Sequence, residues 1–275
     1  VVLKNEIVAT ALFEIKANNL ISYWTDYPLE LGNGKVRIDY NTIEESLESR
    51  ADFDVVQYED YLLDQHELVM RKRPHQLLNV STDVRTLRKT NNDTITEKIV
   101  LNMSILSNYL DFLLDFADTT EILALRSFGS LEFDDDSISI QLEESKLFLD
   151  HVPWYFSNHS RAVYTNGGLH LSKVELSNSG QRLSINGFVD EDPNHHVVIN
   201  TSNLDLHNFN PLLQPYGFKI GGVSNESVNI YQVLKRPIIQ GNLEIDELAV
   251  NGDKLGNFSI EPTSKEKRLK MDVIA

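Results

Sequence analysis

The chain contains no cysteine among its 275 residues, which excludes disulfide bonds, thiolate zinc sites and cysteine nucleophiles. This absence leaves the compartment open, because many large periplasmic proteins also avoid cysteine. No run approaches the roughly 20 apolar residues that a transmembrane helix needs, and no signal peptide opens the chain. The first residue is Val1 rather than Met. We therefore expect a fragment of a longer protein whose membrane anchor or targeting segment lies elsewhere.

Basic residues are scarce relative to acidic ones. The chain has 25 Lys and Arg against 41 Asp and Glu, which gives a formal net charge of -16. Such a chain repels phosphate backbones, so nucleic acid is not an expected partner. The densest basic segment is Arg71-Lys72-Arg73, with Arg85, Arg88 and Lys89 nearby. Acidic residues surround it, which argues against a nucleic-acid patch.

The usual catalytic motifs are also missing. We find no G-x-S-x-G, H-E-x-x-H, P-loop or G-x-G-x-x-G. His195-His196 follow Asp190-Glu191-Asp192, which suggests a metal cluster, but Pro193-Asn194 between them marks an exposed turn and favours a solvated loop. Asp134-Asp135-Asp136 lacks the spacing of a calcium loop and is typical of an acidic turn. The sequence thus predicts no enzyme, cofactor or metal.

Short apolar-polar alternations dominate what is present. Examples are Val36-Ile38-Tyr40, Ile138-Ile140-Leu142 and Leu183-Ile185, separated by Gly, Asn and Asp. This period of two predicts half-buried strands joined by tight turns, with roughly eighteen candidates in all. Short connections favour antiparallel pairing. We predict a mainly β fold, one continuous architecture over residues 1–275, whose long sheet must curl, fold over or split.

Two segments have helical patterns. In Ser104–Phe116 the residues Tyr109, Phe112, Leu113 and Phe116 fall on one helical face, which predicts a helix covering an edge or end of the β core. A second short helix is expected over Asn208–Gln214, with Asp205 or Asn208 as its cap and Pro211 near its start.

Two helices can cover only part of such a sheet, and an apolar sheet face must be covered by something. Either the sheet curls onto itself around a dry core, or its apolar face lines a groove for an apolar ligand. The pattern alone favours the dry core.

The order of motifs in the second half resembles the TamB family, an AsmA-like group of translocation and assembly module proteins in Gram-negative envelopes. The resemblance covers about residues 138–275 and thins before them. It is carried by the segments Gln181–Val189 (QRLSINGFV), Thr201–Leu213 (TSNLDLHNFNPLL), Gly221-Gly222, Lys235–Leu243 (KRPIIQGNL) and Val250–Gly256 (VNGDKLG). The predicted helix at Ser104–Phe116 departs from this pattern.

This resemblance implies a periplasmic segment of an inner-membrane-anchored protein. Its sheet would curl into an open half-pipe, or β-taco, with an apolar interior that carries phospholipid acyl chains between the two membranes. A TamA-like outer-membrane barrel would be its partner. The alternatives are a chaperone-type module that assists outer-membrane protein insertion, and a purely structural β-solenoid spacer. With this resemblance, the groove becomes the favoured interpretation of the apolar sheet face, ahead of the dry core.

If a groove exists, alternation selects its lining. Ser184, Glu244 and Ser259 would face water, so the apolar residues on either side of each in the sequence are expected to point into the groove. These residues are Leu183, Ile185, Leu243, Ile245, Phe258 and Ile260.

Overall fold

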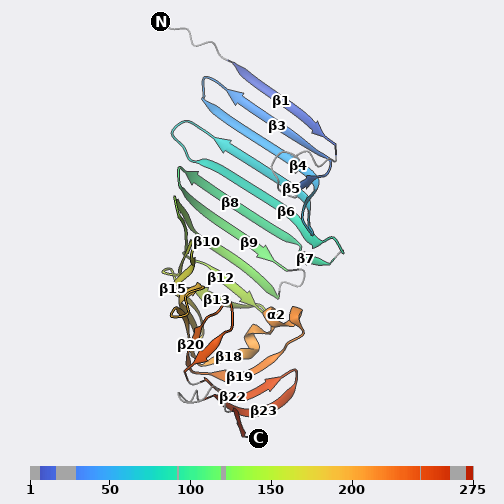
Figure 1. The fold of residues 1–275 in the computed structure, drawn as a ribbon. Helices are drawn as coiled ribbons and strands as arrows, with labels where there is room; N and C mark the ends of the chain where they lie inside the picture. Colours follow the sequence, from blue (N-terminus) through green and yellow to red (C-terminus); the bar gives the residue numbers. More distant parts are fainter. Residues whose placement is uncertain are drawn as a thin grey trace. The chain divides into compact units, whose positions relative to one another are not determined.

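A computed structural model describes residues 7–16, 29–91, 93–118, 122–241, 243–260 and 271–274. Among these residues, nineteen strands belong to one sheet and five to a second. The paired strands are antiparallel, as the arrows of the long strands in Figure 1 show. The predicted mainly β, antiparallel fold class is confirmed. The chain divides into two compact units, Val1–Arg126 and Ser127–Ala275, which we take in turn.

The first unit is built from long neighbouring strands. Its seven long strands follow one another in the order β1-β3-β4-β5-β6-β8-β9, while β2 and β7 are short strands that pair with β4 and β6. Figure 1 shows the long strands side by side. The strand bounds are β1 Val8–Ile15, β2 Leu29–Leu31, β3 Gly34–Asn41, β4 Ser46–Tyr58, β5 Tyr61–Lys72, β6 Leu78–Lys89, β7 Thr94–Thr96, β8 Lys98–Leu106 and β9 Tyr109–Ala117.

The helix predicted over Ser104–Phe116 is wrong. That segment is the end of β8, a tight turn and most of β9, with Leu106 opposite Tyr109 and Lys98 opposite Ala117. Ser107 adopts a left-handed φ of 53°, which makes the turn without a glycine. Apolar residues at 109, 112, 113 and 116 fit a helical period, but pairing with the whole length of β8 determines the structure.

The second unit begins within β10, Leu123–Asp134, and contains the remaining strands. Its part of the large sheet includes the neighbours β11-β14-β15-β16-β17-β20-β21, and β18-β19-β22-β23-β24 form the five-stranded sheet. The bounds are β11 Ser137–Leu142, β12 Lys146–Leu149, β13 Val152–Phe156, β14 Arg161–Thr165, β15 Gly168–Asn178, β16 Gln181–Asp190, β17 His196–Ser202, β18 Leu204–Asp205, β19 Ile220–Ser224, β20 Ser227–Tyr231, β21 Ile238–Gln240, β22 Leu243–Val250, β23 Asp253–Ile260 and β24 Met271–Ile274.

The second predicted helix is confirmed as three short helical turns: η1 Leu206–Phe209, α2 Asn210–Leu213 and η2 Gln214–Tyr216. Asp205 caps the first turn, because its Oδ1 accepts a hydrogen bond of 3.0 Å from the His207 backbone N–H. Pro211 lies in the first turn of α2, where a missing N–H is tolerated.

A closed core lies beneath these turns. Trp154 of β13 and Leu149 of β12 are fully buried, and the Trp154 ring meets Phe209 at 5.2 Å between centroids. Two buried hydroxyls tie the surrounding backbone. Ser145 Oγ accepts from the Phe128 N–H at 3.0 Å, and Ser160 Oγ donates to the Lys173 carbonyl at 3.1 Å. This part of the second unit therefore has a buried core.

Candidate functional site

The long strands of the first unit present one almost wholly apolar face. Residues directly opposite each other in antiparallel strands share a face, so the register defines rows that cross the sheet. Three alternate rows make up what we call the apolar face: Ala11-Ile38-Ser49-Met70-Val80-Met103-Phe112, Phe13-Val36-Ala51-Leu68-Thr82-Leu101-Leu114 and Ile15-Gly34-Phe53-His66-Val84-Ile99-Phe116. These rows contain no Asp, Glu, Lys or Arg.

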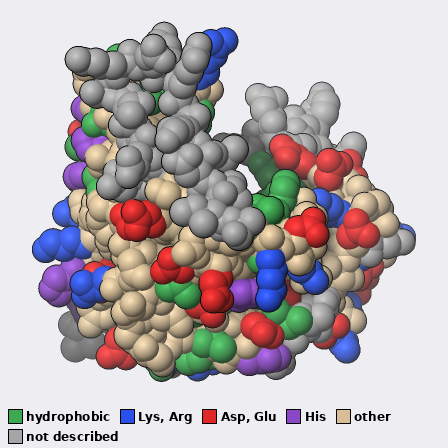
Figure 2. All heavy atoms as spheres, turned by 90° about the horizontal axis from the view of Figure 1, so that it is seen from below, with side chains coloured by type: hydrophobic (Ala, Val, Ile, Leu, Met, Phe, Trp, Pro, Cys, Tyr) green, Lys and Arg blue, Asp and Glu red, His purple; other side chains and the backbone are tan. Residues whose placement is uncertain are grey.

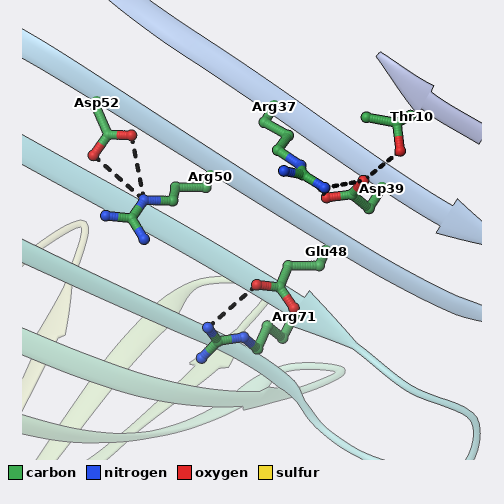
Figure 3. Close-up of polar contacts among 7 residues, drawn as sticks. All are labelled: Thr10, Arg37, Asp39, Glu48, Arg50, Asp52 and Arg71. Carbon is green, nitrogen blue, oxygen red and sulfur yellow. Dashed lines mark hydrogen bonds and ion pairs between the residues drawn. The ribbon is translucent and has the colours of Figure 1, made fainter. Parts of the chain in front are cut away.

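The intervening rows form what we call the charged face. Arg37 Nε contacts Asp39 at 2.7 Å, and Arg71 contacts Glu48 at 3.2 Å (Figure 3). Arg50 bridges Asp52 at 3.3 Å on its own strand and Glu67 at 3.1 Å on β5. Among the rows named here, the charges therefore lie on one side of the sheet.

Asp39 illustrates how these contacts affect ionisation. The hydrogen bond from Arg37, and then the 2.6 Å bond from Thr10 Oγ1, lower the pKa of the Asp39 carboxyl below its usual value. The side chains lie at the surface, where water and salt screen such pairs, so they contribute little stability. Their effect is to keep the charged face hydrated.

The apolar face is only partly covered. No helix occurs among the described residues of the first unit. Phe13 is 52% exposed and Met70 37%, whereas Val84 and Phe112 are buried. Most other residues of the three rows are half-buried, so the apolar face as a whole, and not any single side chain, is the candidate binding surface.

His66 is the polar residue of the apolar face with the most unusual environment. His66 Nε2 shares a 2.6 Å hydrogen bond with Thr82 Oγ1, while its buried Nδ1 has no partner in the described part of the chain. Burial lowers the pKa of the His66 imidazole below its ordinary value. The ring is therefore neutral at neutral pH, and the apolar face carries no charge there.

An irregular line crosses the first unit next to His66. Gln65 has a left-handed φ of 51°, and the register skips the positions of Asp54, Gln65 and Arg85. Before this line, apolar residues alternate in step with Phe53 and His66. Beyond it they occupy the positions in between, in the row Leu31-Val56-Leu63-Leu87-Thr96. A cleft of about 600 Å³ opens here, and charged residues such as Glu14, Lys35 and Asp52 contribute to its lining.

The second unit repeats the alternation, and two of the predicted lining residues belong to it. Leu183 lies opposite Leu176, and Ile185 lies between Val174 and Ile199, all on one face. Ser184 faces the other side, opposite Glu175 and Asn200. Leu183 and Ile185 are each half-buried.

The other four predicted lining residues lie in the five-stranded sheet. The register places Leu243 opposite Ile260 and Ile245 opposite Phe258, while Glu244 and Ser259 are paired with each other. Ile245 is only 8% exposed, and a Cβ on Gly222 would approach its Cγ2 to 2.7 Å. The side chains of Leu243 and Ile260 lie outside the described residues. Six residues proposed as one lining are thus divided between two sheets.

Sequence reasoning missed the apolar face of the first unit as a candidate site. The signal was present in Val36-Ile38 and in Ala51-Phe53, whose side chains occupy its rows. The second half of the chain is richer in glycine, so its strands are easier to separate in the sequence.

The histidines of the predicted solvated loop take part in ring stacking. Phe188 stacks between His170, at 4.2 Å, and His195, at 4.6 Å. His195 Nδ1 lies 2.6 Å from Asp190 Oδ2, and this hydrogen bond raises the pKa of the His195 imidazole. Across the described ranges no three His, Asp or Glu side chains are placed to hold a metal ion. Asp134 is opposite Ser137, so the acidic segment is a turn, as predicted.

Elsewhere the surface is mixed. Figure 2 shows acidic, basic and histidine side chains interspersed over one view of the molecule, with hydrophobic side chains in small groups among them. Within the described ranges, no helix has both the length and the apolar character to cross a membrane. Comparisons with models of protein families, with curated proteins and with solved structures find no match to this chain.

Proposed function

We propose that this chain is a segment of a lipid-transfer protein that carries phospholipid acyl chains on apolar sheet faces. The observation that supports the proposal is the separation of side chains in the first unit. Three rows without a charged residue lie on one face, and the ion pairs of Arg37, Arg50 and Arg71 lie on the other. A face of this kind suits an aliphatic ligand.

The dimensions of the rows suit an acyl chain. Each row crosses seven strands, and strands lie about 4.8 Å apart, so six spacings give a length of about 29 Å. One leaflet of a bilayer core is about 15 Å thick. A row is therefore about twice as long as the depth that an acyl chain spans in one leaflet, so the chain can move along it without losing contact.

The mechanism is passive. Each methylene that leaves water contributes about 0.8 kcal/mol, so the face needs no specific polar contact to hold a lipid. Successive rows offer similar aliphatic surfaces, which keeps the barrier to sliding low. The phosphate head group stays in water, because the apolar rows provide no cation to bind it.

The resemblance to the TamB family is the basis of the cellular setting that we propose. On that proposal the chain lies in the periplasm, belongs to a protein anchored in the inner membrane, and works with a TamA-like outer-membrane barrel. Phospholipid would pass between the two membranes. The motif order of residues 138–275 is the support for this assignment.

Photo-crosslinking in cells tests the lipid proposal. A crosslinking residue at Leu68 or Ile185 is expected to capture phospholipid. The same residue at Glu67 or Ser184, each one position away and on the opposite face, is expected to capture none. Mass spectrometry of lipids extracted from the purified chain provides an independent measurement. Equal capture at both members of each pair, or no capture at either, would reject the proposal.

A structural spacer is the second candidate, and the closed core around Trp154 favours it for that part of the second unit. A spacer predicts no bound lipid at any of the four positions.

A further inference from the structure

The edge of β1 that faces away from β3 is the starting observation. In the described part of the chain β1 pairs with β3 alone. The Ile7 N–H donates to Thr42 Oγ1 at 2.8 Å, and the Ile7 carbonyl accepts from the Thr42 N–H at 3.0 Å. Backbone groups alternate in direction along a strand, so odd-numbered residues of β1 point toward β3. The N–H and C=O groups of Val8, Thr10, Leu12 and Glu14 therefore point away from the sheet.

This edge lacks the features that usually prevent strand pairing. Soluble proteins protect exposed edges with proline, bulges, several charges or very short strands. β1 runs for eight residues, VATALFEI, with an unbroken one-to-one register against β3. It contains no proline or glycine, and Glu14 is its sole charged residue. Val8 and Leu12 are each 64% exposed. The edge is thus long, regular and apolar.

We propose that the edge of β1 is a strand-addition site, and that its partner is an extended polypeptide with apolar side chains at alternate positions. Ala11, Phe13 and Ile15 are the residues of the apolar face at this edge, and Ala9 lies on the same side of β1. An incoming antiparallel strand must therefore place apolar residues opposite them. Its intervening residues, which pair with Val8, Thr10, Leu12 and Glu14, are neutral or basic. An acidic residue opposite Glu14 would be repelled.

The β1 sequence itself meets these requirements. If Ala11 of an added antiparallel copy lies opposite Ala11, then Ala9 lies opposite Phe13 and Thr10 lies opposite Leu12. Small residues then face large ones on the apolar side. Even-numbered residues also meet even-numbered residues, so their outward N–H and C=O groups can bond in pairs. A peptide of this sequence is therefore a suitable probe of the edge.

The consequence of pairing is growth of the sheet. An added strand extends the apolar rows by one residue each and covers the exposed side of Phe13. This mode of recognition uses main-chain bonds for affinity and alternate side chains for specificity. The proposal does not rest on lipid binding, because the edge is defined by backbone groups.

The test uses the whole chain and a labelled peptide that spans Ile7–Lys16 (IVATALFEIK), with binding followed by fluorescence anisotropy. Two N-methylated peptides provide the comparison. Methyl groups on the nitrogens of Thr10 and Leu12 block the bonds to β1, whereas methyl groups on Ala9 and Ala11 point away from it. We expect the second peptide to bind as the unmodified one does, and the first to bind at least roughly tenfold more weakly, since each lost bond lowers affinity by up to about that factor.

A protein variant tests the same edge from the other side. Leu12→Pro removes one outward N–H but leaves the odd-numbered bonds to β3, and it is expected to weaken binding by a similar factor. Leu12→Val serves as the control. Circular dichroism shows whether the proline variant still folds, and the peptide comparison does not depend on that variant. Absence of saturable binding, or equal binding by both methylated peptides, overturns the proposal.

Discussion

Leu113 and Leu114 are neighbours in β9 that lie on opposite faces of the sheet, and together they offer a direct test of the apolar face. Leu114 lies opposite Leu101 on the apolar face, and Leu113 lies opposite Asn102 on the charged face. Both side chains are half-buried. Replacing each by glutamine makes the same chemical change on the two sides of one strand.

The expected effects on lipid binding differ because only one of the two contacts the proposed ligand. Leu114→Gln removes about two methylene contacts from an acyl chain lying along its row, at about 0.8 kcal/mol each. The affinity for lipid should therefore fall by roughly tenfold or more, since about 1.4 kcal/mol corresponds to a factor of ten. Leu113→Gln should leave affinity unchanged.

The expected effects on stability are small and similar. Leu114→Gln loses one apolar cross-strand pair, which costs about 0.2–1 kcal/mol. Urea unfolding of both variants measures this, and titration of a fluorescent phospholipid analogue into each folded variant measures affinity. If Leu113→Gln weakens binding as much as Leu114→Gln, or if neither has an effect, the assignment of the apolar face as the lipid site is wrong.

Three further predictions concern individual side chains. Trp154→Ala should lower the free energy of unfolding, measured by chemical denaturation, by about 3–5 kcal/mol. Trp154→Phe should lower it much less, because Trp154 Nε1 is buried without a partner in the described residues. Removing that N–H relieves a penalty of about 1–3 kcal/mol. Equal costs would show that the indole N–H is satisfied. The lowered pKa of His66 means that the unfolded state binds the proton more readily, so stability should be full above about pH 6.5 and fall as pH drops below it. His66→Phe should lack this component in urea unfolding at pH 7 and 5.5, and identical pH dependence would contradict the reasoning. The raised pKa of His195 has the opposite sign: its stabilising contribution is present below about pH 6.5 and is lost as pH rises through the folded value. Asp190→Asn should lower the His195 pKa in an NMR titration, and an unchanged value would exclude Asp190 as the cause.

The sequence was sufficient for the fold class because the period of two is a local property. Val36-Ile38-Tyr40 and Leu183-Ile185 each alternate within a few residues, and each lies in a strand with those side chains on one face. Asp205 and Pro211 were likewise recognisable, since a cap and a proline at a helix start act through their own backbone.

Long-range pairing determined what the sequence did not predict. The β8–β9 hairpin places nine residues of each strand in register, and that pairing overrides a helical spacing in Ser104–Phe116. The irregular line at Gln65 is equally hard to foresee, because a glutamine rarely adopts a positive φ. The division of the predicted lining between two sheets follows from pairing partners, which alternation cannot reveal. Ile185 and Ile245 have similar local sequences but different neighbours.

β15 contains a bulge whose geometry bears on how its sequence can change. The register shifts by one residue between Leu171 and Val174, where Lys173 has a φ of 51° and its N–H donates to Asn186 Oδ1 at 2.5 Å. Because of the extra residue, Leu171 and Val174 share a face although three positions separate them. Loss of Lys173 in evolution would restore simple alternation and leave every later side chain on its present face. Loss of Glu175 would turn Leu176 and all the residues after it to the opposite face. We therefore expect a deletion in this strand to be tolerated at the bulge and selected against elsewhere.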